Sequence, residues 1–108
     1  MNRWIEYAPV DGWALFERSA PLIDALWNRL PEDDWHYMNF VVGSSLWESR
    51  RDASMVSVHI NGEQIVHLAT QDGDAGAVIE PLASEFGLVP IASWETESND
   101  ASNQAKQE

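Results

Sequence analysis

The sequence predicts an α+β fold, a two-layer sandwich in which a mostly antiparallel sheet of about four to six strands carries two helices on one face. Three observations lead to this prediction. Two segments repeat apolar residues at helical spacing, and several others are rich in β-branched and aromatic residues. An Asn-Gly pair at 61–62 separates two of the β-rich runs, which is typical of a hairpin.

The first elements are a strand over residues 3–8 and a helix over residues 19–30. Residues 13–17 between them fit either a short strand or a helical lead-in. Ser19 is suited to cap the helix, and Pro21 falls in its first turn, where the missing N–H costs little. Apolar side chains three and four apart give this helix one apolar face, which includes Trp27.

The middle of the chain predicts a strand over residues 35–42, followed by a break at 43–45. Leu46 and Trp47 could form a short extension after the break. Residues 48–53 hold the only adjacent basic pair and are expected to form a solvated loop.

The strongest local signal is the hairpin expected over residues 55–70. With Asn61 and Gly62 as the central residues of a type I′ turn, the hairpin pairs Val56 with His67. This register predicts that His59 and His67 lie on opposite faces.

A second helix is expected over residues 75–86, although Pro81 should kink it or delay its start. Gly87 is a plausible stop. A last strand over residues 88–94 contains Pro90 and is therefore expected at a sheet edge.

Length and composition predict one acidic α+β domain over residues 1–95 and a disordered C-terminal tail over residues 96–108. The chain has 108 residues, of which 44% are hydrophobic. The tail has no large apolar residue, and most of the net charge of −12 stays on the domain.

This charge argues against direct binding to nucleic acid or to an anionic membrane, because 18 acidic residues face only 6 Lys and Arg. It favours a basic protein partner. There is no cysteine, no secretory signal and no apolar stretch that could span a membrane, so we expect a cytoplasmic location.

No pattern predicts catalysis, a metal or a cofactor, so we expect no enzyme. The segment 43–45 is not a nucleophile elbow. His36, His59 and His67 are not expected to converge on an ion, and the segment 72–74 lacks the later residues of a calcium loop.

The candidate partner-binding residues are acidic clusters and two tryptophans. Trp13 and Trp47 lie near breaks or ambiguous segments and are the candidate exposed anchors, whereas Trp4, Trp27, Trp35 and Trp94 are expected in the core. Asp72 or Asp74 is also expected to cap the second helix. The candidate acids are Glu32, Asp33, Asp34, Glu48, Asp52, Asp72 and Asp74.

The leading functional hypothesis is a small acidic inhibitor that masks a basic surface of a protein partner. Immunity proteins and antitoxins that neutralise nucleases, and phage inhibitors that mimic nucleic acid, are two such classes. One alternative is a secretion-type chaperone or adaptor that acts as a dimer and exposes an apolar patch. Another is a small-molecule-binding domain with an enclosed pocket. The sequence leaves monomer and homodimer open.

Overall fold

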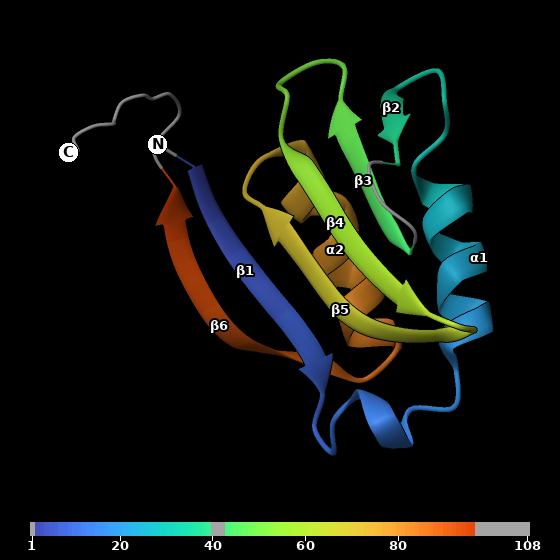
Figure 1. Cartoon of the computed structure of the whole chain (residues 1–108). Helices are drawn as coiled ribbons and strands as arrows, with labels where there is room; N and C mark the ends of the chain where they lie inside the picture. The colour runs from blue at the N-terminus through green and yellow to red at the C-terminus, as the bar shows by residue number, and fades with distance from the viewer. Residues whose placement is uncertain (1, 40–42, 97–108) are drawn as a thin grey trace, which may run out of the picture.

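A computed structural model describes residues 2–39 and 43–96 and shows a six-stranded antiparallel sheet with two helices (Figure 1). The strands are β1 (Asn2–Pro9), β2 (Trp35–Met38), β3 (Ser44–Ser49), β4 (Met55–Asn61), β5 (Gln64–Gln71) and β6 (Leu88–Thr96). The helices are α1 (Ser19–Arg29), α2 (Asp74–Glu85) and the 3-10 turn η1 (Trp13–Leu15). The strand order is β2-β3-β4-β5-β1-β6. The N-terminal strand therefore inserts between β5 and the C-terminal strand.

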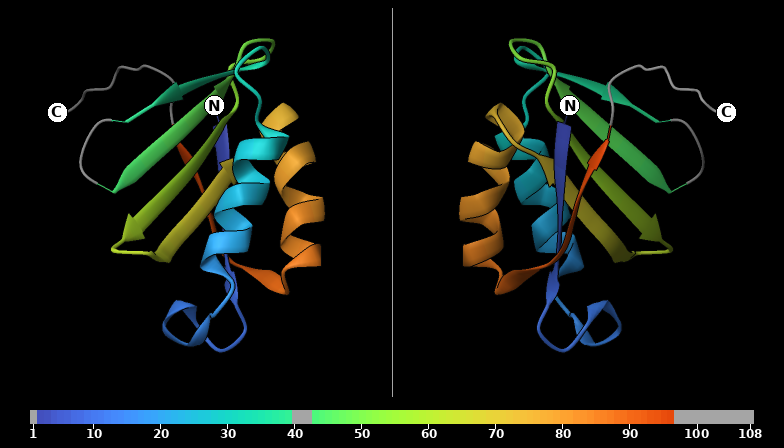
Figure 2. Two further views of the ribbon diagram at one scale, coloured as in Figure 1. Left: turned by 90° about the vertical axis from the view of Figure 1, so that its right-hand side faces the viewer. Right: turned by 90° about the vertical axis from the view of Figure 1, so that its left-hand side faces the viewer.

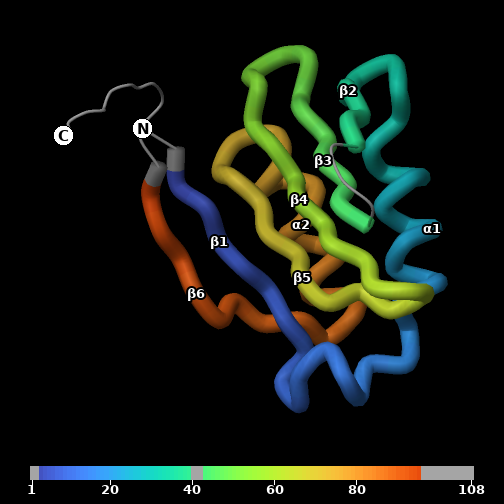
Figure 3. The backbone as a smooth tube through the Cα atoms, viewed as in Figure 1, coloured from blue at the N-terminus to red at the C-terminus, as the bar shows by residue number. Residues whose placement is uncertain are grey.

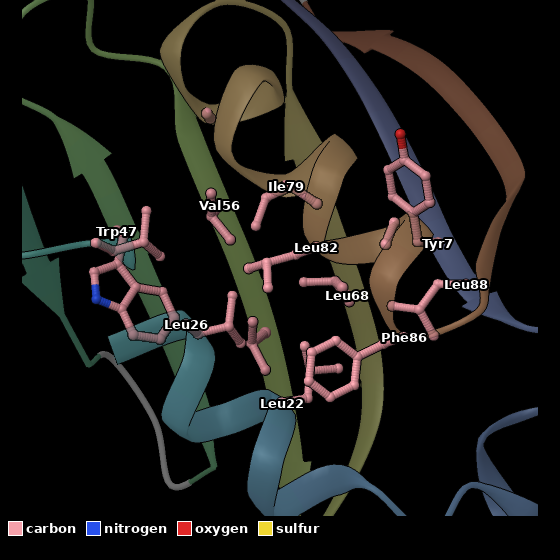
Figure 4. Packing of buried hydrophobic residues seen from close by; sticks show 14 of the residues in the cluster. Tyr7, Leu22, Leu26, Trp47, Val56, Leu68, Ile79, Leu82, Phe86 and Leu88 are labelled. Carbon is pink, nitrogen blue, oxygen red and sulfur yellow. The ribbon is translucent and has the colours of Figure 1, made fainter. Parts of the chain in front are cut away.

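Both helices lie on one face of the sheet, and no helix within residues 2–39 and 43–96 lies on the other face (Figure 2). The core forms where the apolar sides of α1 and α2 meet the inner sheet face (Figure 4). Its most deeply buried side chains include Leu22 and Leu26 from α1, Ile79 and Leu82 from α2, and Val56, Val58, Ile65 and Leu68 from the strands. Each such side chain contributes about 1.5–3 kcal/mol when it leaves water.

The α+β prediction is confirmed, and so are both helices. The apolar spacing located α1 to within one residue at its C-terminal end. The helix α2 begins at Asp74 rather than later and includes Pro81, so the expected delay is wrong. The side chain of Pro81 is exposed, so its ring lies outside the core. The expected edge position of β6 is confirmed as well.

The predicted register of the hairpin is wrong. Asn61 pairs with Gln64, so the central residues of the turn are Gly62 and Glu63. Only Gly62 of these two has a positive φ, which is the pattern of a type II′ turn rather than type I′. A bulge follows, because His59 pairs with His67. The two histidines therefore lie opposite each other on the same sheet face.

The expected break and solvated loop at 43–53 are partly wrong, because Ser44–Ser49 is strand β3. Its residues alternate between half-buried and buried, as in a strand with one face on the core. Ser45 and Ser49 are tolerated on the inner face because their hydroxyls are hydrogen-bonded, that of Ser45 to the Tyr37 hydroxyl at 3.0 Å.

Two sequence predictions fall on undescribed residues. The expected strand at 35–42 is observed as β2 through Met38, and residues 40–42 lie outside the described part of the chain. The expected disordered tail begins at 96, which is instead the last residue of β6, and residues 97–108 are also outside it. Within the described ranges, neither helix has the length and apolar character needed to cross a membrane.

Candidate functional site

The first turn of α2 takes its capping groups from the loop between β3 and β4. Asp52 Oδ2 accepts the Asp74 amide at 2.9 Å, and Ser54 Oγ accepts the Ala75 amide at 2.9 Å. The N-cap position itself is Gly73, with φ 99°. A Cβ at Gly73 would come within 2.5 Å of Asp52 Oδ2, so glycine permits this approach. The expectation that Asp72 or Asp74 caps α2 is therefore wrong.

The same loop binds the Asp74 carboxylate. Ser49 Oγ donates to Asp74 Oδ2 at 2.8 Å, and Arg51 Nε lies 3.0 Å from that oxygen. Ser49 Oγ also accepts the amides of Arg51 and Asp52, at 3.1 and 3.3 Å. Ser49 is 4% exposed, so these polar contacts satisfy a buried hydroxyl. The loop and the start of α2 form one hydrogen-bonded unit.

A third segment joins this unit through Arg50. The Arg50 amide donates to the Asp34 carbonyl at 3.0 Å, and Arg50 Nε donates to the Glu32 carbonyl at 3.1 Å. The connections at 31–34, 50–54 and 72–74 consequently lie together at one end of the molecule (Figure 3). We call this the acidic loop end. Its acids are Glu32, Asp33, Asp34, Asp52, Asp72 and Asp74.

The acids of this end differ in their electrostatic state. Hydrogen bonds from Ser54 and from the Asp74 amide lower the pKa of Asp52 from 3.8 to about 2, so this carboxylate stays ionised. Glu32, Asp33 and Asp72 are exposed and form no side-chain hydrogen bond within the described residues. Arg50 and Arg51 compensate only part of the negative charge of the six acids at this end.

Two hollows flank the β3–β4 loop. One, of about 470 Å³, is lined by Asp34, Asp74, Arg29 and Arg51, which shows that the two predicted acidic clusters share one surface. The other, of about 640 Å³, is lined by His36, Glu48 and residues 49–53. The sequence predicted these acids as candidates and left their adjacency open.

The two predicted tryptophan anchors are not placed with the acids. Trp47 is 3% exposed and packs against both Trp27 and Tyr37, with ring centroids 5.1 and 5.2 Å away. The prediction that Trp47 is an exposed anchor is therefore wrong, because its side chain lies on the inner face of β3. Trp13 is half-buried in η1 and edge-on to Phe16. The turn η1 is the short blue helical segment after β1, at the other end of the molecule (Figure 1).

The most exposed tryptophans are ones that the sequence assigned to the core. Trp27 is 47% exposed and Trp94 is 40% exposed, whereas Trp35 is buried as expected. Trp94 stacks on half-buried Trp4, with centroids 6.2 Å apart and an interplanar angle of 11°. Apolar spacing identified the Trp27 face correctly, but the rim of that face remains in solvent.

The helix-free sheet face carries polar groups at its centre. His67 Nε2 lies 3.6 Å from Glu6 Oε2, beside the cross-strand partner His59. Among residues 2–39 and 43–96, no group of three or more His, Asp or Glu side chains is arranged to hold a metal ion.

Sequence reasoning missed the residues that assemble the acidic loop end, namely Ser49, Arg51 and Ser54. The only available signal was the basic pair at 50–51, set between acids and serines. It also missed Tyr7, whose ring lies in the core and whose hydroxyl leaves it (Figure 4).

The fold and this end define the molecule as an acidic α+β domain with a preassembled, carboxylate-rich surface. No protein-family model, curated protein or solved structure matches the chain.

Proposed function

We propose that this protein is a non-catalytic binding protein that masks a basic surface of a protein partner with its acidic loop end. One observation carries the proposal. Three segments that are distant in sequence, and that hold six acidic residues, are hydrogen-bonded into one surface. An interface whose loops are already held together loses less entropy on binding than one that must order its loops.

The charge of this end sets the chemistry of the partner. Exposed carboxylates attract Lys and Arg and accelerate encounter with a positive surface. A nuclease or another nucleic-acid-binding protein has such a surface where it binds phosphates. In this proposal the protein acts in the cytoplasm without a metal or cofactor. It serves either as an immunity protein or antitoxin, or as a mimic of nucleic acid.

A capture experiment with salt steps tests the proposal. Immobilised wild-type protein is expected to retain a basic protein from a lysate of the source cells and to release it as NaCl rises. A triple charge reversal, Glu32→Lys, Asp33→Lys and Asp72→Lys, is expected to abolish retention of that protein. These three side chains are exposed, so the substitutions leave the loop hydrogen bonds in place.

The matched control reverses three exposed acids at the other end, Asp11→Lys, Glu17→Lys and Glu63→Lys. It changes the net charge equally and should retain the partner. Equal loss in both triple variants would mean that only net charge matters. A retained protein that is itself acidic, or that resists high salt, would contradict the proposal.

A homodimeric adaptor is the second candidate, and a specific observation favours it. The strand β6 forms one edge of the sheet and leaves Val89, Ile91 and Trp94 exposed by 39%, 54% and 40%. A long edge with few charges is a surface on which another strand can pair. Mass measured in solution by light scattering separates the candidates, because a dimer that Ile91→Lys dissociates would support the adaptor.

A further inference from the structure

A small pocket beside the acidic loop end lies between α2 and β1. It has a volume of about 210 Å³. Its walls are partly apolar, through Ile5 and Ala77. Its polar lining residues include Tyr7, Asp72 and Glu80.

The Tyr7 hydroxyl is the unusual member of this pocket. The side chain is 8% exposed, and its ring packs in the core cluster. The hydroxyl points away from Phe86 and Leu88, into the space between α2 and β1 (Figure 4). No hydrogen bond formed within residues 2–39 and 43–96 involves it. The oxygen itself is not fully enclosed, because Trp13 Nε1 and Trp47 Nε1 are the fully buried side-chain polar atoms of the described residues that lack a hydrogen bond. The Tyr7 hydroxyl therefore faces the open space of the pocket.

The neighbouring polar groups have other partners. Thr70 Oγ1 donates to the Gln71 carbonyl at 3.0 Å, and Gln71 Oε1 accepts the Met55 amide at 3.0 Å. Arg3 lies on the same face of β1 but donates to Ser93 Oγ at 3.3 Å. Within the described residues it forms no ion pair with either pocket carboxylate.

We propose that this pocket binds the guanidinium group of an arginine side chain from the basic partner, with Asp72 and Glu80 as ion-pair acceptors and the Tyr7 oxygen as a third acceptor. The inference rests on the proposed function, because Asp72 belongs to both the pocket and the acidic loop end. Guanidinium suits partly apolar walls better than ammonium, since it is planar and more weakly hydrated.

The ionisation of Tyr7 agrees with such a site. Burial and the negative charges of Glu80 and Asp72 raise the pKa of Tyr7 above 10.0. The hydroxyl is therefore neutral at physiological pH and retains lone pairs that accept a hydrogen bond.

The test uses N-acetyl-L-arginine amide as the probe and the matching citrulline compound, which is neutral and of the same shape, as the control ligand. Amide NMR spectra of the full chain are expected to shift with the arginine compound at residues 5–7, 70–77 and 80. Tyr7→Phe and Glu80→Gln are expected to weaken this binding by about threefold or more each, whereas Glu63→Gln leaves it unchanged. Tyr7→Phe keeps the ring that packs in the core.

Three results would overturn the inference: equal shifts with the citrulline compound, shifts spread over all exposed acids, or unchanged affinity in Tyr7→Phe and Glu80→Gln. Dispersed spectra of each variant show that it is folded. The probe contains no partner protein, so failure here leaves the capture experiment with the triple charge reversals to decide the proposed function separately.

Discussion

At the scale of single residues, Asp52 shows how one carboxylate can join two elements. Its two oxygens accept hydrogen bonds from different sources: Oδ1 binds the amide and hydroxyl of Ser54, and Oδ2 binds the Asp74 amide. The residue lies 22 positions before the helix that it caps. Local capping patterns cannot identify such a partner, because they examine only residues adjacent to the helix.

Asp52→Ala is expected to lower the free energy of unfolding by about 1 kcal/mol at neutral pH, the usual value for a lost N-cap. The pKa of Asp52 is about 2 in the folded protein against 3.8 unfolded, so its stabilisation is complete above the unfolded value. It disappears as pH falls from 3.8 through about 2. Urea unfolding of wild type and variant across this range measures it. A difference that stays constant with pH would contradict the role of the charge.

At the scale of elements, the close approach of the β3–β4 loop to α2 depends on Gly73. Its φ of 99° and ψ of −145° lie in a region that other residues rarely adopt. Gly12, with φ 88° and ψ 164°, has a similar backbone, but a Cβ there would meet nothing within 4 Å. The two glycines therefore separate backbone strain from steric conflict with Asp52.

Gly73→Ala and Gly12→Ala are each expected to cost about 1–3 kcal/mol of stability from backbone strain. Gly73→Ala should cost about 1 kcal/mol more, because it displaces the capping carboxylate. In the Asp52→Ala background this additional cost should disappear. Urea unfolding of the two single variants and the double variant measures the coupling. Additive effects of Gly73→Ala and Asp52→Ala would show that the predicted steric conflict is absent.

At the scale of the whole molecule, a net charge of −12 acts against folding. Like charges repel more strongly in the folded chain, and salt screens that repulsion. Raising NaCl from about 20 mM to 500 mM is expected to stabilise the protein by about 0.5–1 kcal/mol. The triple variant with lysines at positions 32, 33 and 72 should show a smaller effect. Denaturant midpoints measure both, and destabilisation by salt would contradict the prediction.

Some elements could be predicted from the sequence and others could not, for physical reasons. Helical spacing identified α1 and α2 because a helix buries one face and the apolar residues repeat along it. The strand β3 was missed because serines occupy inner positions, where distant hydrogen bonds satisfy them. The hairpin was located, but its register was wrong, because a glycine can enter a tight turn at either central position.

The sequence by itself determined the α+β class, both helices and the edge position of β6, because these depend on local spacing and composition. Only the tertiary structure decided which acids lie together and which tryptophans reach solvent. Those outcomes depend on contacts between residues far apart in the chain, such as Arg50 with Asp34 and Asp52 with Asp74. The inner position of Trp47 follows likewise from the pairing of β3 with β4 and its packing against α1.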